Sequence, residues 1–499
     1  MNMRTRTTNK KSIAVVALMA MAVAACGGGG GSIVDSGSTE APSTSDGGST
    51  EAPSTSAAPL SDLPPCDPSA LESVTGPVEI TFWHGMNGEL EKSLVALTDE
   101  YNASQSKVKV SLENQGGYEQ TLDKYLQSGS GSLPDMVQAP EYAVQVMNDT
   151  DSNVPVGACI EADAYDTSDF QAKALDQYFT EGVQWAMPFN VSDPVLYYNK
   201  KVFEAAGLDP ETPPSSLEEL RSMSQTIVDS GAAAFGLALD TGADSGGGWF
   251  LEQWFAKLGE PFSDNDNGRT APSTKVLFDS EIGVELLTQL QSLVNDGLAY
   301  NVGDNASGQD ALLKLADPDK PAAMTIATSA ALGTVLSVVA AGTIAGVSVN
   351  DIGVGPMPGP GGAPGAIVGG ASLWIVDNGD AVKSAATWDF IKFLVSAQTQ
   401  STWASATGYV PVRSAALELD PVKTTYSDDL RFRVAYDQLG EAADSPATVG
   451  AILGPQREIR NITAQAIATI LQGGDVASTL SAAASQANAL LADYLANNG

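Results

Sequence analysis

The sequence predicts an α/β fold built as two lobes, and three observations support this expectation. The chain has 499 residues, of which 43% are hydrophobic and 17% charged, so it is longer than a single ordinary core can hold. Strand-like and helix-like patterns alternate along most of it. Long helices rich in Ala and Leu close the sequence.

The first strands and helices alternate in the order typical of a parallel sheet covered by helices. Leu90, Leu94, Leu97 and Tyr101 recur at helical spacing after a run of β-forming residues. The expected strands of this first set cover 78–83, 108–112 and 134–138. The expected helices cover 87–102, 118–127 and 141–147.

A second α/β set begins in the run Pro-Val-Leu-Tyr-Tyr-Asn within 187–199. Ser216 and Glu219 have the spacing of a capping box, which predicts a helix from there to about residue 229. The apolar stretch 330–349 is open to two interpretations, a membrane span or a buried helix with a turn, and its small residues favour the second. The other expected helices cover 200–206, 281–295, 330–340, 382–395, 426–439, 456–471 and 476–496. The other expected strands cover 323–327, 351–354 and 371–376.

Charge and residue usage exclude several classes of function. With 25 Lys+Arg against 60 Asp+Glu, the net charge of −35 disfavours nucleic acid and anionic membranes as partners. With 3 Cys and 1 His, a Cys/His zinc site is nearly excluded, and a Ser-His-Asp site would need His84. We therefore expect no metal and no cofactor. An exported hydrolase using two carboxylates, and an adhesin or sensor, remain alternatives.

The N-terminus has the pattern of a secretory signal peptide. Four basic residues precede the apolar run 13–25, which is short for a membrane span and ends at Cys26. Small residues before Cys26 resemble a lipobox, so we expect cleavage of residues 1–25, lipidation of Cys26 and anchoring to the outer face of the cell membrane. A plain export signal or an uncleaved anchor is the alternative.

The segment 26–72 is predicted to be a flexible, lipid-anchored linker. It is rich in Gly, Ser, Thr and Pro, and one eight-residue sequence occurs at both 38–45 and 49–56. Beyond Cys26 the remaining cysteines are Cys66 and Cys159, an even pair in an oxidising compartment. A disulfide between them is favoured, with two separate buried thiols as the alternative.

Several motifs resemble those of ABC-importer extracellular solute-binding proteins of the large sugar-binding type. They are Phe-Trp-His-Gly-Met-Asn-Gly-Glu-Leu at 82–90, Gly-Gly-Tyr-Glu-Gln at 116–120, Pro-Phe-Asn-Val-Ser-Asp-Pro-Val-Leu-Tyr-Tyr-Asn-Lys at 188–200, Ala-Gly-Leu-Asp-Pro-Glu-Thr-Pro-Pro at 206–214, Gly-Gly-Ala-Ser-Leu-Trp at 369–374, Thr-Gly-Tyr-Val-Pro at 407–411 and Gln-Arg-Glu-Ile-Arg at 456–460. The resemblance is strongest to members that bind sn-glycerol-3-phosphate and glycerophosphodiesters. Relatives that bind oligosaccharides or polyols share some of these motifs, so such a ligand is the alternative.

The resemblance implies a periplasmic-binding-protein-like fold that closes on a small solute and delivers it to ABC permease subunits. It implies a protein that acts as a monomer and performs no chemistry on its solute. Matching the family's crossing strands to this chain puts the crossings near Pro188, Thr328 and Leu373. The expected lobes are then 73–188 plus 329–373, and 189–328 plus 374–499.

The resemblance also implies a set of ligand-binding residues. Arg460 is the most informative, because a planar guanidinium binds oxyanions well, and Arg457 is the competing position. The family's Ser-Ser-Gly-Ser run is replaced here by Thr328-Ser329-Ala330-Ala331, a departure that weakens the assignment of a phosphate to this turn. The expected ligand-binding residues are Tyr118, Glu141, Ser192, Trp249, Thr328, Ser329, Gly369, Gly370, Tyr409 and Arg460.

Overall fold

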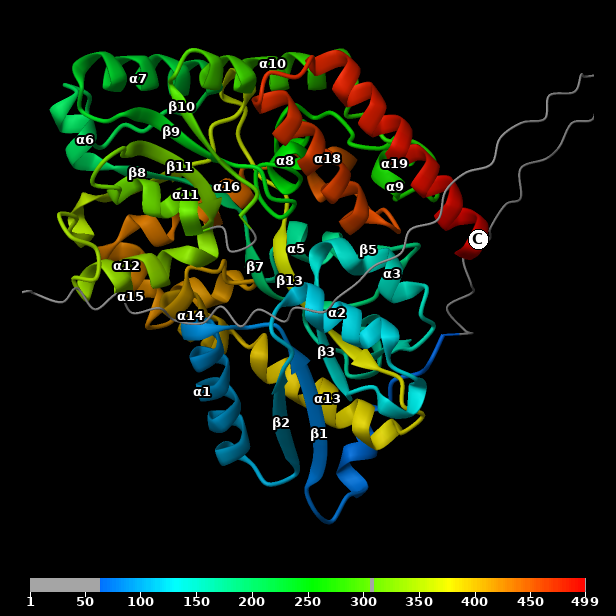
Figure 1. Ribbon diagram of the computed structural model, residues 1–499. Coiled ribbons are helices and arrows are strands. Elements are labelled where there is room, and N and C mark those ends of the chain that lie inside the picture. The colour runs from blue at the N-terminus through cyan, green and yellow to red at the C-terminus, as the bar shows by residue number, and fades with distance from the viewer. Residues whose placement is uncertain (1–62, 306–308, 499) are drawn as a thin grey trace, which may run out of the picture. The chain divides into compact units, whose positions relative to one another are not determined.

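Two mixed β-sheets with helices around them form the folded part of the chain (Figure 1). This computed structural model describes residues 63–305 and 309–498. The expected signal peptide, Cys26 and most of the expected linker lie outside the described residues. We call the elements around the first sheet the first lobe and those around the second sheet the second lobe.

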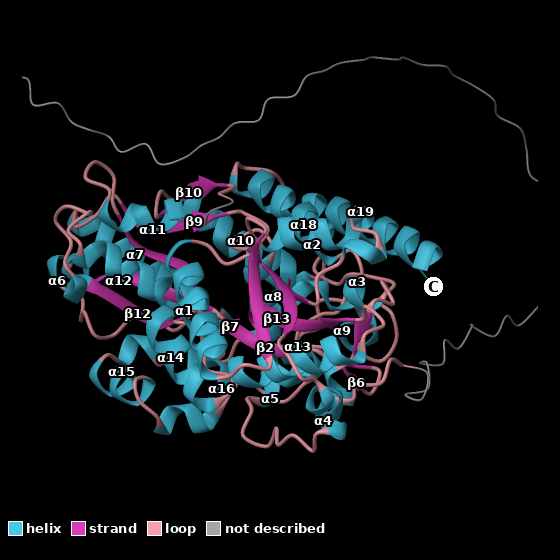
Figure 2. Cartoon of the chain, turned by 90° about the horizontal axis from the view of Figure 1, so that it is seen from below, coloured by secondary structure: helices cyan, strands magenta, loops and turns pink. Residues whose placement is uncertain are grey.

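The first sheet has the strand order β2-β1-β3-β13-β4, and β7 also pairs with β13. β1 is parallel to β2 and β3, as the alternating pattern predicts. The later strands are antiparallel: β13 runs against β3, β4 and β7. Figure 2 shows β7 and β13 beside one another in the middle of the view. The strands are β1 (Val78–His84), β2 (Val108–Asn114), β3 (Met136–Pro140), β4 (Asn153–Val154), β7 (Met187–Ser192) and β13 (Gly369–Val376).

The second sheet has the order β10-β9-β11-β8-β12. β9 is parallel to β10 and β11, whereas β8 is antiparallel to β11 and β12. A short hairpin of β5 (Phe179–Thr180) and β6 (Val183–Gln184) stands apart from both sheets. The strands of the second sheet are β8 (Pro194–Asn199), β9 (Phe235–Asp240), β10 (Ala299–Gly303), β11 (Ala322–Thr328) and β12 (Ile352–Pro356).

Helices account for most of the remaining described chain. In the first half they are α1 (Gly88–Ser104), α2 (Tyr118–Gln127), α3 (Val144–Asn148), α4 (Val156–Ala162), α5 (Ala172–Gln177), α6 (Lys200–Ala205), α7 (Leu217–Ser230), α8 (Trp249–Lys257), α9 (Asp264–Gly268) and α10 (Glu281–Asn295). In the second half they are α11 (Gln309–Leu313), α12 (Leu332–Ala340), α13 (Ala381–Leu394), α14 (Ala397–Thr407), α15 (Val422–Asp428), α16 (Val434–Gly440), α17 (Pro446–Val449), α18 (Gln456–Leu471) and α19 (Val476–Asn498).

The start of α7 shows how the sequence directs a helix boundary. Ser216 Oγ accepts a hydrogen bond from the Glu219 backbone N–H (3.0 Å), as expected for a helix N-cap. The Glu219 carboxylate accepts from the Ser215 N–H (2.8 Å) instead of the Ser216 N–H. The helix ends at Gly231, whose positive φ of 73° suits glycine.

The helix expected over 426–439 is wrong, because the chain breaks there into α15, a 3₁₀ turn η10 (Leu430–Phe432) and α16. At the break Asp429 adopts an extended conformation (φ −137°, ψ 91°), and its carboxylate accepts a hydrogen bond from the Arg431 N–H. Asp competes with the helical backbone in this way and therefore favours caps over helix interiors.

The apolar stretch after residue 329 forms the short 3₁₀ turn η6 (Ser329–Ala331) and then α12. Within the described ranges, no helix has both the length and the apolar character needed to cross a bilayer. A helix forms there as expected, but the expected burial is wrong, because only Leu332 and Val339 of α12 are buried.

The chain passes between the two sheets in two places. It passes at Asp193, between β7 and β8, and again between β12 and β13. No passage between the sheets directly follows Thr328, where one was expected, because β11 and β12 lie in the same sheet. Pairing of β12 with β8 puts this strand in the second sheet, and α13 packs on β1 (Figure 1). The positions of β12 and α13 differ from the expected lobe division, which assigned 329–373 to the first lobe and 374–499 to the second. The exact residue limits of the two lobes stay a prediction.

The N-terminal end of the described chain is cross-linked to the first lobe. A disulfide joins Cys66 to Cys159 in α4, and both cysteines are buried. The 3₁₀ turn η2 (Pro68–Ser73), just after Cys66, packs against α13. Residues 66–73 thus belong to the first lobe.

Candidate functional site

A buried arginine with three carboxylates lies where the two lobes meet. Arg460, on α18 of the second lobe, has a side chain that is 3% exposed. Its Nε and Nη2 donate to the two carboxylate oxygens of Glu252 at 2.8 and 2.9 Å. Its Nη1 donates to Glu141 Oε1 at 2.8 Å and lies 3.6 Å from Asp244 Oδ1. We call Arg460, Glu141, Glu252 and Asp244 the arginine cluster.

The cluster draws its members from both lobes. Glu141 begins the 3₁₀ turn η4 (Glu141–Ala143), directly after β3 of the first sheet. Glu252 lies on α8, of which every residue is buried. The loop before α8 can approach α18 because residue 248 is glycine: a Cβ there would lie 2.9 Å from Arg460 Cβ and 2.2 Å from the Ala243 carbonyl oxygen.

The electrostatics of the cluster keep the guanidinium charged and make one carboxyl unusually basic. Burial alone would lower the pKa of Arg460, but Glu252 and Glu141 raise it overall. Burial raises the pKa of Glu141 to about 7, although Arg460 opposes this shift. With all groups ionised, three negative charges surround one positive charge.

Two tyrosines from distant parts of the chain meet beside the cluster. The hydroxyls of Tyr118 and Tyr409 lie 3.0 Å apart. Asn190 Nδ2 donates to Tyr118 Oη at 2.6 Å, and Gln138 Nε2 donates to Asn190 Oδ1 at 2.8 Å. Burial raises the pKa of both phenols, and the nearby Glu141 carboxylate adds to this. Both tyrosines therefore act as neutral hydrogen-bonding groups.

Trp249 crosses from the second lobe to the first sheet. It is 5% exposed, and a Cβ on Gly369 would lie 2.2 Å from its Cζ2. Gly369 pairs with Ser192 across β13 and β7. Gly370 has φ +92°, and a Cβ there would lie 2.0 Å from the Asn190 carbonyl oxygen. Glycine is thus required at this meeting point for close backbone approach.

Two buried polar groups near the cluster lack a partner within the described part of the chain. These are Trp249 Nε1 and Tyr142 Oη. The centroid of the Tyr142 ring lies 5.1 Å from the Arg460 guanidinium carbon. Unpaired buried polar groups are costly, so each of the two can take one further hydrogen bond.

Thr328 and Ser329 are bonded to the chain around them rather than to the arginine cluster. Thr328 Oγ1 accepts from the Ala330 N–H at 3.2 Å. The Ser329 N–H donates to the Asp193 carbonyl oxygen at 2.9 Å, and the Tyr197 hydroxyl donates to the Thr328 carbonyl oxygen at 2.9 Å. These bonds join the residues that follow β11 to Asp193 and to β8. Thr328 and Ser329 therefore have a structural role.

Two further residues singled out by the sequence are bonded to other partners than the members of the cluster. Arg457, with 26% of its side chain exposed, pairs with Asp123 and Glu458. His84 is buried, its Nδ1 accepts from the Met86 N–H at 3.3 Å, and burial lowers its pKa. Neither arrangement provides a free group for the junction.

Glu252, Tyr142, Asn190 and Gln138 belong to this region but were not predicted from the sequence. Glu252 had a signal, because it is the single acid in the strongly apolar run Trp-Phe-Leu-Glu-Gln-Trp-Phe-Ala. A charge in such a run needs a partner when the helix is buried. The other three carry ordinary polar side chains in strands and turns, where no local pattern distinguishes them.

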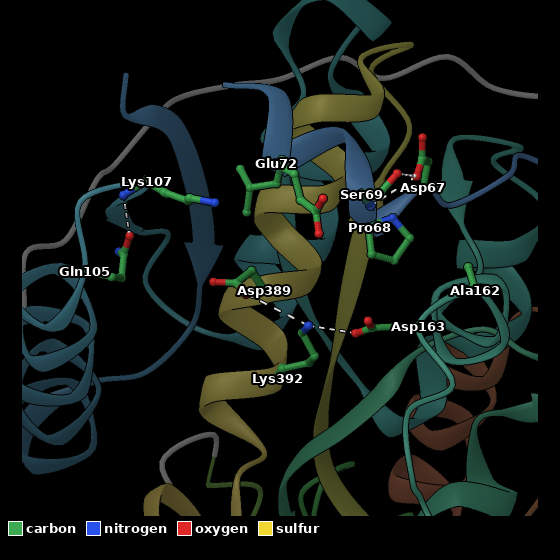
Figure 3. A pocket seen from close by; sticks show the side chains of 11 residues that line it. Asp67, Pro68, Ser69, Glu72, Gln105, Lys107, Ala162, Asp163, Asp389 and Lys392 are labelled. Carbon is green, nitrogen blue, oxygen red and sulfur yellow. Dashed lines mark hydrogen bonds and ion pairs between the residues drawn. The ribbon is translucent and has the colours of Figure 1, made fainter. Parts of the chain in front are cut away.

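A pocket of about 450 Å³ lies elsewhere, on the first lobe between η2 and α13 (Figure 3). Of its charged residues, Lys392 is paired with two acids, because its Nζ lies 2.7 Å from Asp163 and 4.0 Å from Asp389. The pocket is polar and shares no residue with the arginine cluster.

Comparison with protein families gives one match over most of the chain. Residues 96–429 match the family model described as bacterial extracellular solute-binding protein.

Individual proteins are also similar. The sn-glycerol-3-phosphate-binding periplasmic protein UgpB of Yersinia pseudotuberculosis is 30% identical over 79% of this chain and 88% of its own length. The crystal structure of UgpB from Mycobacterium tuberculosis in complex with glycerophosphocholine matches with a TM-score of 0.68 and 21% identity, over 85% of this chain and all of that one. The cyclic alpha-maltosyl-1,6-maltose binding protein of Arthrobacter globiformis matches with a TM-score of 0.67 and 25% identity, over 83% of this chain and 99% of that one.

Proposed function

Because this chain belongs to the family of bacterial extracellular solute-binding proteins, we propose that it captures glycerol-3-phosphate or a glycerophosphodiester for an ABC importer. Proteins of this family bind the substrates of ABC importers outside the cytoplasm and are not enzymes.

The observation that carries this proposal is the buried guanidinium of Arg460 at the junction of the lobes. A guanidinium presents planar donors that match phosphate geometry, and burial strengthens such bonds. The unpaired donors of Trp249 and Tyr142 and the hydroxyls of Tyr118 and Tyr409 surround the same junction. They suit the hydroxyls of a glycerol moiety. The names of the UgpB relatives agree with this ligand class.

Lobe closure explains how such a protein captures and releases a solute. Arg460 and Trp249 come from the second lobe, whereas Glu141, Tyr118 and Gly369 come from the first lobe. A solute that contacts both sets favours the closed arrangement by its differential affinity for it. Opening separates the solute from the residues of one lobe, which allows its transfer to permease subunits.

A neutral oligosaccharide or polyol is the second candidate, and a specific observation favours it. Glu252 and Glu141 already accept three hydrogen bonds from Arg460, and the cluster carries more negative than positive charge. Carboxylates bind sugar hydroxyls readily, and tyrosine and tryptophan rings stack on sugar faces. The Arthrobacter globiformis relative carries a sugar ligand in its name.

Titration calorimetry with glycerol-3-phosphate, glycerophosphocholine and maltose separates the two candidates. We expect the purified protein to bind at least one of the two phosphate compounds and to bind maltose more weakly. Arg460→Lys keeps the charge but loses the planar pair of donors, so it should weaken phosphate binding at least tenfold. Arg457→Lys is the matched control and should change the affinity less than twofold. Tight maltose binding without phosphate binding would overturn the first candidate.

We also propose that the protein is a monomer anchored through a lipid on Cys26. The apolar run that precedes Cys26 supports this assignment. Mass spectrometry of the membrane-extracted protein should show an N-terminal diacylated Cys26, and Cys26→Ala should release the protein into the medium. Equal release of the wild type and of the Cys26→Ala variant into the medium would contradict the lipid anchor.

A further inference from the structure

Glu252 is a buried acid that the proposed ligand contacts do not explain. It is 4% exposed and lies in the apolar helix α8. Both of its carboxylate oxygens are engaged: Oε1 accepts from Arg460 Nε, and Oε2 accepts from Arg460 Nη2 and from Gln456 Nε2 at 3.2 Å. A two-point ion pair of this kind fixes the plane of the guanidinium.

The pair determines which donors of Arg460 remain for a solute. Arginine has five N–H groups, and Glu252 takes the one on Nε and one on Nη2. Glu141 takes one on Nη1. One N–H on each terminal nitrogen is left, and the one on Nη1 lies on the side of Asp244, at 3.6 Å. The guanidinium thus keeps at most one N–H on each terminal nitrogen for a solute, while its charge is compensated.

Charge compensation has a consequence for solutes that differ only in the charge of their phosphate. A phosphate monoester carries nearly two negative charges above pH 7, because its second pKa is about 6, whereas a diester carries one. Each additional negative charge in the solute is repelled by the carboxylates around Arg460, and this repulsion is strong in a buried site.

We propose that Glu252, together with Asp244, is a specificity-determining residue that sets the charge preference of the solute site. It holds Arg460 as a hydrogen-bond donor but cancels its charge. The site therefore favours phosphodiesters, especially those with a cationic group in the same molecule, over phosphate monoesters. This inference rests on the proposed function, since it concerns the same site.

The test compares the Kd of glycerol-3-phosphate with that of glycerophosphocholine by calorimetry at pH 8 and low salt. Glu252→Gln removes one negative charge at nearly constant shape. The ratio of the two dissociation constants should shift at least tenfold toward glycerol-3-phosphate. Asp244→Asn should shift it in the same direction by about threefold, and it also carries the test if Glu252→Gln does not fold, because the Asp244 side chain is 58% exposed.

Glu458→Gln is the matched control, because Glu458 lies on α18 but pairs with Arg457, and its ratio should stay within twofold of the wild type. A ratio that also stays within twofold in both test variants would overturn the inference, even if both solutes bind more weakly, since a merely structural role affects them equally. A wild-type protein that binds neither phosphate compound would overturn the proposed function and, with it, this role of Glu252.

Discussion

Replacing Gly369 by alanine should weaken solute binding by obstructing the contact between the lobes. Gly369 begins β13 of the first sheet, and Trp249 begins α8 of the second lobe. A Cβ on Gly369 would lie 2.2, 2.8 and 3.0 Å from three atoms of the Trp249 ring. Carbon atoms in contact need about 3.5–4.0 Å, so the ring or the strand must move by more than 1 Å by this comparison.

The magnitude follows from the packing around Trp249. The ring is 5% exposed and packs against Phe250, with ring centroids 5.7 Å apart, so it has little room to turn aside. Overpacking of this kind costs about 1–3 kcal/mol. Because the two residues belong to different lobes, opening relieves the clash, and the cost falls on the closed arrangement alone. Affinity should therefore fall about 5–150-fold.

Calorimetry with the best of the three test solutes measures this loss, and thermal unfolding without solute checks that the fold is intact. Gly440→Ala is the matched control, because a Cβ at this last position of α16 meets nothing within 4 Å. It should leave both affinity and stability nearly unchanged. An affinity of Gly369→Ala within twofold of the wild type would show that solute binding does not require this contact between the lobes.

Three further predictions concern stability. Replacing both Cys66 and Cys159 by alanine should lower the free energy of unfolding by about 2–5 kcal/mol, because the cross-link spans 93 positions of the sequence; urea denaturation measures it, and a reductant should then affect only the wild type. Burial raises the folded-state pKa of Glu141 to about 7, above its ordinary value of 4.5. The folded protein therefore holds a proton that the unfolded chain releases between these two values, and the contribution of Glu141 to stability is lost as the pH rises through that window. Glu141→Gln should flatten the corresponding fall in Tm, and parallel Tm curves would refute this. Ser216→Ala removes the cap of α7 and should lower the free energy of unfolding by about 1 kcal/mol, as measured by chemical denaturation. No measurable change would mean that the hydrogen bond from the Glu219 N–H does not contribute to stability.

Long periodic segments were predictable because local spacing alone determines them. The helices expected over 87–102, 118–127 and 281–295 lie within two residues of α1, α2 and α10. The break at Asp429 was not predicted, because an acid inside a helical pattern gives no sign of whether its side chain will cap the next turn. The antiparallel pairing of β13 in the first sheet was also not predicted, although the strand itself was expected over 371–376, since pairing between β13 and β3 depends on segments more than 200 positions apart.

The site shows a similar division between local and long-range information. The family motifs drew attention to Arg460, and the structure puts this side chain in contact with Glu141 across the lobes. Its partner Glu252 is 208 positions away, and no sequence spacing relates the two. Local chemistry could identify Glu252 as a misplaced charge, but only the tertiary fold could supply its partner.

The bonds between Asp193 and Ser329 have a mechanical consequence. The Ser329 N–H donates to the Asp193 carbonyl oxygen, and the Asp193 N–H donates to Ser329 Oγ. The link between β7 and β8 is thereby bonded to the turn η6 that follows β11, so a twist imposed on one is transmitted to the other. The two lobes are therefore expected to rotate about one shared axis and not to slide or rotate independently.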